Sequence, residues 1–282
     1  MEYVCLDLEG VLIPEIWSEV AKFTGEDKFN LTTQDIKDYS ELMDMRIGLV
    51  EAMDISISDI QAVVHKIEPF EGAREFMDWA RDNFQVTIVS DSFYQLAWPL
   101  IRKLGTPSII CHHLKIEEDK LKGYSLRQKE NKKRVVQALK ALKYRVFAAG
   151  DSYNDIQMLT EADLGVFFQA PEHIKNEFPK INCVENYVEL KKVFFGTCLM
   201  DTLKMKIKLM SNIKRSLCKK NKMNDDIKII FMSSIKLETN EEEFLFWKTH
   251  KEKILSNFAI LDDKYFWQNN LANKNLFEIN RF

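Results

Sequence analysis

The sequence has few cysteines, no long apolar run and no signal-like start, and each shortage excludes a class of protein. Its five cysteines are an odd number, are widely spread and form no C-x-x-C pair, which argues against a disulfide framework and a zinc ribbon. No stretch approaches the roughly 18 apolar residues of a spanning helix, so we expect no membrane span. The first residues lack the basic segment and cleavage site of a signal peptide, which predicts a cytoplasmic location.

Glycine and proline are also scarce, and their distribution divides the chain. All 6 prolines and 8 of the 9 glycines precede residue 196. Residues 1–195 carry 24 basic and 32 acidic side chains, whereas residues 196–282 carry 16 and 11, so the net charge of −3 conceals two segments of opposite sign. We therefore place a boundary near Phe195.

The segment 196–282 carries no site motif. Apolar residues recur at helical spacing from Leu199 to Leu217 with basic residues between them, which predicts a helix with a basic face. Such a helix can pack against protein, lie on an anionic membrane surface or bind nucleic acid. We favour packing, expect no nucleic-acid partner, and interpret 196–282 as a mainly helical C-terminal extension of unassigned function.

Residues 1–195 alternate short apolar runs with helical stretches. The runs are typical of strands buried in a parallel sheet, and the alternation predicts an α/β fold with a doubly wound, mostly parallel sheet. The expected strands cover residues 3–8, 85–89, 109–111, 144–149 and 164–168, and the expected helices cover residues 72–82, 93–104, 132–142 and 155–162.

The stretch between the first two expected strands is too long for a single crossover helix and shows no strand pattern. We therefore expect a small helical cap at residues 11–70, inserted into a core made of residues 1–10 and 71–195. A cap in this place is expected to close over the site and to exclude water.

Polar side chains follow three of the expected strands, and the carboxyl ends of parallel strands meet at one crevice. One carboxylate of the Asp7–Glu9 pair can attack a substrate while the other moves protons. Two further carboxylates follow the fourth strand, and such an oxygen-rich cluster suits Mg²⁺. Ser90, with nearby backbone N–H groups at a helix entry, can hold a phosphate, and Lys132, in the basic run 129–134, can bring a cation.

These residues, in this order, resemble the haloacid-dehalogenase-like phosphotransferases, which combine an acidic pair, a Ser or Thr, a Lys and a G-D-x-x-N-D motif. Within that superfamily the chain from Met1 to about Phe195 resembles the bifunctional phosphoserine phosphatase / homoserine phosphotransferases of the threonine pathway. Most of the superfamily has Asp where Glu9 stands, whereas this subfamily has Glu. The segments that carry the closer resemblance are M-E-x-x-C-L-D-L-E-G-V-L at the start, Pro14–Trp17, Thr32–Tyr39, Leu126–Lys129 and Ala148–Asp155.

The resemblance implies a Mg²⁺-dependent enzyme that hydrolyses O-phospho-L-serine through an aspartyl-phosphate and can pass the phosphate to L-homoserine. Asp7 is then the nucleophile, and Glu9 is the acid/base that protonates the leaving alkoxide and later activates water. Asp151 is a Mg²⁺ ligand together with the side chain of Asp7 and a group at Glu9. Asn154 and Asp155 orient the site.

The resemblance also implies how the phosphate is held. Ser90 binds it with its hydroxyl, and Asp91 contributes through its backbone. Lys132 neutralises the phosphoryl group, with Lys129 and Lys133 close enough in sequence to remain alternatives.

Phosphoserine carries a carboxylate and an ammonium besides its phosphate, so the cap should present an arginine and a carboxylate. Arg46 is the best arginine and Glu15 the best partner for the ammonium, although each can also be an ordinary helix charge. Two other functions stay open: a phosphatase for another small phosphomonoester, and a phospho-accepting signalling module, which also combines an acceptor Asp, a hydroxyl residue and a Lys. A homodimer is also open.

The triplet Cys111-His112-His113 has no matching Cys/His pair elsewhere in the chain. We interpret it as a turn at the end of a strand and not as a transition-metal site.

Overall fold

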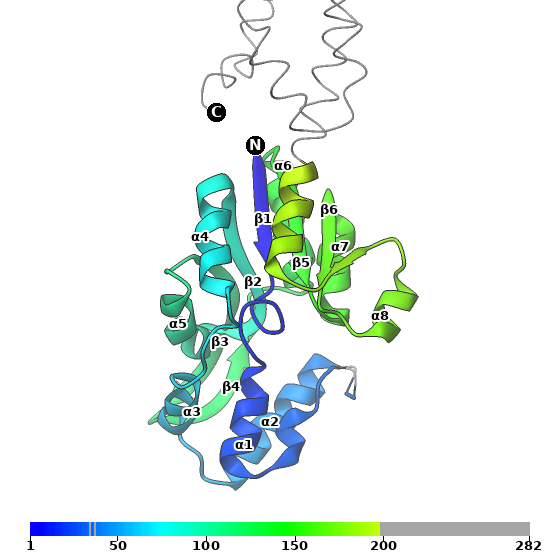
Figure 1. Ribbon diagram of the computed structural model, residues 1–282. Helices are drawn as coiled ribbons and strands as arrows, with labels where there is room; N and C mark the ends of the chain where they lie inside the picture. Colours follow the sequence, from blue (N-terminus) through cyan, green and yellow to red (C-terminus); the bar gives the residue numbers. More distant parts are fainter. Residues whose placement is uncertain (34, 37, 198–282) are drawn as a thin grey trace, which may run out of the picture. The chain divides into compact units, whose positions relative to one another are not determined.

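A seven-stranded sheet lies at the centre of the part of the chain that the computed structural model describes, which is residues 1–197 without 34 and 37 (Figure 1). Its order is β4-β3-β2-β1-β5-β6-β7, and the β3–β4 pair is antiparallel while the other neighbours are parallel. The strands are β1 (Glu2–Leu6), β2 (Gln85–Phe93), β3 (Ser108–Glu117), β4 (Lys120–Ser125), β5 (Arg145–Gly150), β6 (Leu164–Phe168) and β7 (Asn182–Val184).

Helices cover both faces of this sheet. Val146 of β5 packs in one cluster with Met158, while the neighbouring Phe147 stacks on Phe194 in the helical segment 187–197, with ring centroids 5.6 Å apart. Because successive side chains of a strand point to opposite faces, β5 is buried between two helical layers. Besides the segment 187–197, the helices after residue 70 are α4 (Ala73–Asn83), α5 (Tyr94–Lys103), α6 (Asn131–Ala141), α7 (Ile156–Glu161) and α8 (Glu172–Glu177), with a short 3₁₀ turn η2 (Tyr153–Asp155) before α7.

A group of helices comes between β1 and β2 in the sequence. In space these helices lie on the side toward which β1 points (Figure 1). Local capping explains where they begin: Asp38 accepts the first free N–H groups of α2, and Ser56 and Asp59 form a capping box at α3. Gly25, in the left-handed region at φ 73°, ends α1. The elements are α1 (Ile16–Thr24), the 3₁₀ turn η1 (Asp27–Asn30), α2 (Tyr39–Ala52) and α3 (Ile57–Val64).

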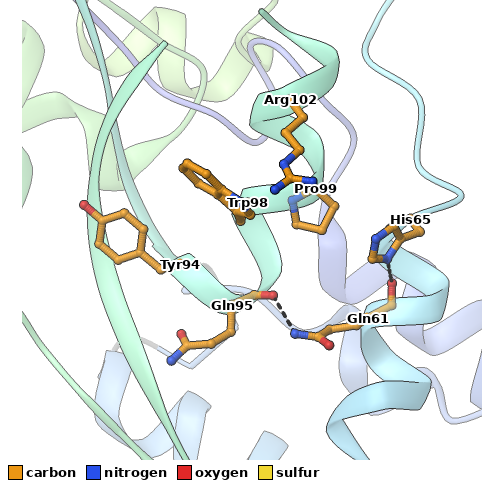
Figure 2. A pocket seen from close by; sticks show the side chains of 7 residues that line it. All are labelled: Gln61, His65, Tyr94, Gln95, Trp98, Pro99 and Arg102. Carbon is orange, nitrogen blue, oxygen red and sulfur yellow. Dashed lines mark hydrogen bonds between the residues drawn. The ribbon is translucent and has the colours of Figure 1, made fainter. Parts of the chain in front are cut away.

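Polar contacts join these helices to the rest of the described chain. Gln61 of α3 donates to the carbonyl oxygen of Gln95 on α5 at 3.0 Å, and the ammonium of Lys103 donates to the carbonyl oxygens of His65 and Ile67 at 2.9 and 2.7 Å. A hollow of about 520 Å³ lies at this joint (Figure 2). None of the predicted site residues is among its lining residues, which are Gln61, His65, Tyr94, Gln95, Trp98, Pro99 and Arg102.

The α/β class and the doubly wound, mostly parallel sheet are confirmed, and all five expected strands are present. The second expected strand was too short, because β2 continues through Ser90 to Phe93 with a shift of register after Val89. Ser90 therefore lies in the irregular end of a strand and not at the entry of a helix.

The interpretation of Cys111-His112-His113 as a turn is wrong. The triplet lies inside β3, which continues to Glu117 and returns as β4. The far half of β3 alternates in burial, and β4 has a single buried residue, Leu121, so both lack the continuous apolar run by which the other strands were found. The three-residue strand β7 was missed for its shortness.

The helical extension was predicted for residues 196–282, and residues 198–282 of it lie outside the described residues. Among the residues described, no helix is long and apolar enough to cross a membrane.

Candidate active site

A buried ion pair between Asp7 and Lys132 lies at the carboxyl ends of the strands, where the crevice was expected. Asp7 directly follows β1, and its backbone N–H donates to the carbonyl oxygen of Ala149 on β5 at 3.0 Å. Lys132 lies in the first turn of α6, and its Nζ is 2.8 Å from Asp7 Oδ2 and 2.7 Å from Asp155 Oδ1. Asp7, Lys132 and Asp155 are 4%, 3% and 0% exposed, so their charges interact with little screening by water.

Lys132 remains a cation in this setting. Burial alone would lower the pKa of its ammonium, but Asp155, Asp7 and Asp91 together raise that pKa well above its usual value. The alternatives left open by the sequence lie elsewhere: Lys133 pairs with Glu130 at 3.5 Å, and Lys129 is exposed. Of these three lysines, Lys132 is the one in the crevice.

Asp155 positions the loop that follows β5. Its Oδ2 accepts the backbone N–H groups of Asp151 and Ser152 at 3.0 and 3.2 Å, while its Oδ1 accepts Lys132. A side chain at position 150 would overlap the carboxyl group of Asp155, which is why glycine is required there. With both oxygens engaged, Asp155 organises its neighbours.

The Asp151 carboxylate lies beside the Asp7–Lys132 pair. Carboxylate oxygens of Asp7, Asp151 and Asp155 all lie within 4.8 Å of one another. On the other side Asp151 lies against Gly10, where a Cβ atom would overlap its carboxyl carbon and where φ is +76°. Gly10 thus permits both the turn after β1 and the close approach of Asp151.

These carboxylates have the electrostatics of a cation site. Burial, followed by the charge of Asp155, raises the pKa of Asp7 well above its usual value and the pKa of Asp151 to about 7. In both cases burial is the larger cause, and the negative charge of Asp155, only partly offset by Lys132, adds to it. Because Mg²⁺ prefers carboxylate oxygens, the donor set of Asp7 and Asp151 fits a divalent cation.

Gly10→Ala tests this packing. We expect kcat/KM for phosphoserine, the substrate expected from the sequence, to fall by about 100-fold. The added methyl group displaces Asp151, and small misplacements of a side chain in a site cause losses of this size. Gly25→Ala is the matched control, because Gly25 has a similar φ of +73° but nothing within 4 Å of an added Cβ. Steady-state kinetics should show Gly25→Ala active despite its strained backbone; equal losses in the two variants would contradict the role given to Asp151.

Ser90 and Asp91 lie at the irregular end of β2. Ser90 is 2% exposed, and its Oγ accepts the backbone N–H of Ser92 at 3.1 Å, so its own O–H remains to donate to a ligand. The amide of Asn154 donates to Asp91 Oδ2 at 3.2 Å. The side chain of Asp91 therefore accepts a hydrogen bond from Asn154, in addition to the phosphate contact expected of its backbone.

Glu9 and Glu15 meet at the start of α1. The backbone N–H of Ile16 donates to Glu9 Oε2 at 2.8 Å, which places the Glu9 carboxylate at the positive end of the helix. Glu15 is accessible to solvent, yet the protein around its carboxyl group, then Glu9 and Asp151, raise its pKa to about 8. A hydrogen bond to Glu9 contributes to the raised pKa of Glu15.

Arg46 of α2 is buried with an incomplete set of partners. Its Nη2 donates to the carbonyl oxygen of Leu31 at 2.8 Å, and its guanidinium lies over the Trp17 ring, 4.9 Å from the ring centroid. Burial lowers the pKa of Arg46, against the charges of Glu9, Tyr39 and Glu15. Its Nε is buried and has no hydrogen-bond partner among the described residues.

Two side chains beside Asp91 were not predicted as site residues from the sequence. Tyr39, the first residue of α2, donates its hydroxyl to the carbonyl oxygen of Asp91 at 2.7 Å, and burial raises the pKa of that hydroxyl. The ring of His112 lies 6.2 Å from the Tyr39 ring. Tyr39 follows a recognisable N-cap residue, but nothing near it in sequence indicates a partner 52 residues away.

Comparison with known proteins agrees with this geometry. The family model for haloacid dehalogenase-like hydrolases matches residues 1–163. The phosphoserine phosphatase ThrH of Pseudomonas aeruginosa is 50% identical over 195 residues, which cover 69% of this chain and 95% of the relative. A phosphoserine phosphatase of Pseudomonas syringae pv. tomato is 49% identical over 195 residues, 69% of this chain and 82% of that protein.

Solved structures share the fold. A phospho-aspartyl intermediate analogue of a phosphoserine phosphatase superposes with a TM-score of 0.59 at 22% identity, over 69% of this chain and 98% of the other. A substrate-bound phosphoserine phosphatase complex gives a TM-score of 0.59 at 21% identity, over 69% and 97% of the two chains.

Proposed function

Because the chain belongs to the haloacid dehalogenase-like hydrolases, we propose that it is a phosphoserine phosphatase that works through an aspartyl-phosphate on Asp7. The observation that carries the proposal is the buried contact of Asp7 with Lys132, at 2.8 Å, within a group of three carboxylates. A nucleophile held against a permanent cation suits phosphoryl transfer, which needs positioning and charge neutralisation above all. The identity of 50% to a phosphoserine phosphatase supports the choice of substrate.

The side chains divide the work as follows. A carboxylate oxygen of Asp7 attacks phosphorus, and the bond between phosphorus and the serine oxygen breaks as Glu9 gives that oxygen a proton. Water then attacks phosphorus while Glu9 takes its proton, and the bond to Asp7 breaks to release inorganic phosphate. Lys132 faces the transferring group in both steps, and Ser90 donates to a phosphate oxygen.

The cofactor we propose is Mg²⁺. Asp7 and Asp151 would hold it with a group at Glu9, and Asp155 would support them through its hydrogen bonds to the loop. When bound, the ion neutralises charge on the phosphate oxygens.

Mg²⁺ should raise the melting temperature of the protein, because it relieves the repulsion between carboxylates. At a concentration 100 times its Kd the expected stabilisation is about 2.7 kcal/mol, or roughly 5–10 °C for a chain of this size. Asp151→Asn should lose this shift, whereas the exposed Asp44→Asn, in α2, should keep it. Thermal melts in EDTA and in MgCl₂ measure the difference, and an unchanged Mg²⁺ response in Asp151→Asn would contradict the proposed ligand set.

Substrate selection is assigned to Arg46 and Glu15. The free Nε of Arg46 suits the carboxylate of phosphoserine, and the Glu15 carboxyl group, at the start of α1 beside Glu9, suits its ammonium. With residues 11–70 acting as a cap, both groups would approach the substrate from the side opposite the phosphate.

Arg46→Met should erase the preference for a substrate carboxylate. We expect kcat/KM for phosphoserine to fall by about 100-fold, as for loss of a charged hydrogen bond of about 3 kcal/mol. The rate with O-phosphoethanolamine, which lacks the carboxylate, should change little. Parallel kinetics with the two substrates, using Arg46→Lys to retain charge without the planar fork, provide the measurement; equal losses on both substrates would show that Arg46 supports the fold and not selection.

We further propose that L-homoserine competes with water for the phosphoenzyme, on the strength of the motifs that resemble the bifunctional enzymes. The decisive assay incubates the protein with phosphoserine and Mg²⁺, with and without homoserine, and resolves inorganic phosphate from phosphohomoserine. If inorganic phosphate is the only product, the protein is a phosphatase without transfer to homoserine. If neither inorganic phosphate nor phosphohomoserine forms, the proposed function is wrong.

Other functions have less support. The alternative of a phosphatase for another small phosphomonoester is tested by measuring kcat/KM for a panel of such compounds. A value higher than that for phosphoserine would favour this alternative. A phospho-accepting signalling module does not fit membership of a hydrolase family, and an Asp7 phosphoprotein that lasts for minutes would be needed to revive it.

A further inference from the structure

His112 is a buried imidazole beside the crevice that the proposed chemistry does not use. It lies on β3 opposite Phe93 of β2 and is 3% exposed. The backbone N–H of Arg127 donates to its Nδ1 at 3.2 Å. A ring nitrogen that accepts a hydrogen bond carries no proton, so the proton of the neutral ring is on Nε2.

His112 Nε2 lies beside the Asp91 carboxylate. The distance from Nε2 to Asp91 Oδ1 is 3.6 Å, while the other carboxylate oxygen accepts Asn154 and lies 3.7 Å from the ammonium of Lys132. Three elements far apart in the sequence thus surround one carboxylate. Burial works against its charge, but Lys132, His112 and Asn154 together lower the pKa of Asp91, so it is ionised at neutral pH.

An ionised Asp91 disfavours the binding of phosphate, which is itself negatively charged. Its charge repels the phosphoryl group and competes with that group for Lys132. A donor on the β3 side opposes this competition, because it draws one oxygen of Asp91 away from the ammonium and reduces the charge that the carboxylate presents to the crevice.

We propose that His112 is a positioning residue whose Nε2 side holds the Asp91 carboxylate toward β3. Asp91 is thereby kept from competing with the phosphoryl group for the ammonium of Lys132, which also contacts Asp7 and Asp155. The proposal rests on the function proposed above, since the competition matters only where phosphate binds beside Lys132. The Tyr39 hydroxyl, which donates to the backbone of Asp91, limits movement of the same residue from the cap.

Two substitutions separate the donor from the bulk of the ring. His112→Gln can place an amide N–H near the position of Nε2, whereas His112→Leu fills the space without a donor. We expect the affinity for inorganic phosphate, measured by calorimetry in MgCl₂, to fall about tenfold in His112→Leu, as for loss of a hydrogen bond to a charged group. His112→Gln should stay within about threefold of the parent.

A double-mutant cycle with Asp91→Asn shows whether His112 acts through Asp91. In the Asp91→Asn background, His112→Leu should change phosphate affinity by less than about twofold, since no carboxylate remains to be held. Equal losses in the two backgrounds, or a loss in His112→Gln as large as in His112→Leu, would overturn the proposal.

The ¹⁵N resonances of His112, assigned by comparison with His112→Gln, report its tautomer directly. A protonated Nε2 is expected, and a protonated Nδ1 would overturn the proposal. Phosphoserine turnover by the parent protein is scored separately: its absence would remove the proposed function, while the phosphate-affinity cycle and the tautomer would still decide the role of His112.

Discussion

Asp7→Asn is expected to abolish turnover of phosphoserine, with kcat lower by a factor on the order of 10⁴ to 10⁶, the range found when a nucleophile is removed. The amide has nearly the shape of the carboxylate and its oxygen can still accept the backbone N–H of Leu8, so the protein should fold. What it lacks is an oxygen able to form the bond to phosphorus. Initial rates of phosphate release and trapping of the phosphoenzyme measure the effect.

The matched control is Asp44→Asn, an equal change of charge at an exposed position of α2. It should retain the parent's rate, and circular dichroism should show both variants folded. A rate for Asp7→Asn within tenfold of the parent would contradict nucleophilic catalysis by Asp7 and, with it, the proposed aspartyl-phosphate mechanism.

Lys132→Met is expected to damage both activity and stability. The rate should fall about 10²–10³-fold, because one preorganised charge facing the phosphoryl group is lost. The free energy of unfolding should fall by about 3–5 kcal/mol, the usual effect of leaving buried charges without their partner. Both partners are almost completely buried, since Asp7 and Asp155 are 4% and 0% exposed.

The stability loss should depend on pH. The pKa of Asp7 is already raised in the folded protein, and removing Lys132 raises it further, so the folded variant binds a proton more readily than the unfolded chain does. Stability from such a group is greatest below its unfolded pKa and is lost as the pH rises through the folded pKa. Urea titrations in EDTA should therefore show a larger deficit, relative to the parent, at pH 8 than at pH 5.

Lys133→Met is the control for this variant, since Lys133 is on the same helix but forms only a partly exposed pair with Glu130. Its effect on stability should stay below about 1 kcal/mol. Comparable losses in the two lysine variants would indicate a general effect of basic residues on α6.

Much of the candidate site was predictable because its residues belong to short motifs next to buried strands. Asp7 follows the apolar run of β1, and the segment from Gly150 to Asp155 follows that of β5. In a parallel sheet the carboxyl ends of neighbouring strands lie together whatever the remaining details of the fold. The convergence of Asp7, Asp151 and Asp155 therefore follows from local patterns alone.

Other features depend on contacts that no local pattern encodes. Lys132 was the lysine favoured by the resemblance, but Lys129 and Lys133 stayed open, and the packing of α6 against β2 and β5 selects Lys132. The strand β3 was predicted too short because its outer part alternates in polarity, and with it the place of His112 was misjudged.

By itself, the sequence determined the fold class and the acidic cluster, and it predicted Asp7 as the nucleophile, since each depends on residues within a few positions of a recognisable strand. The tertiary structure removed the alternatives to Lys132, and it alone showed that Tyr39 reaches Asp91 from α2 and that His112 lies beside the same carboxylate. The physical reason is distance along the chain. These contacts join side chains from separate elements, and only packing of the sheet with its helices brings them together.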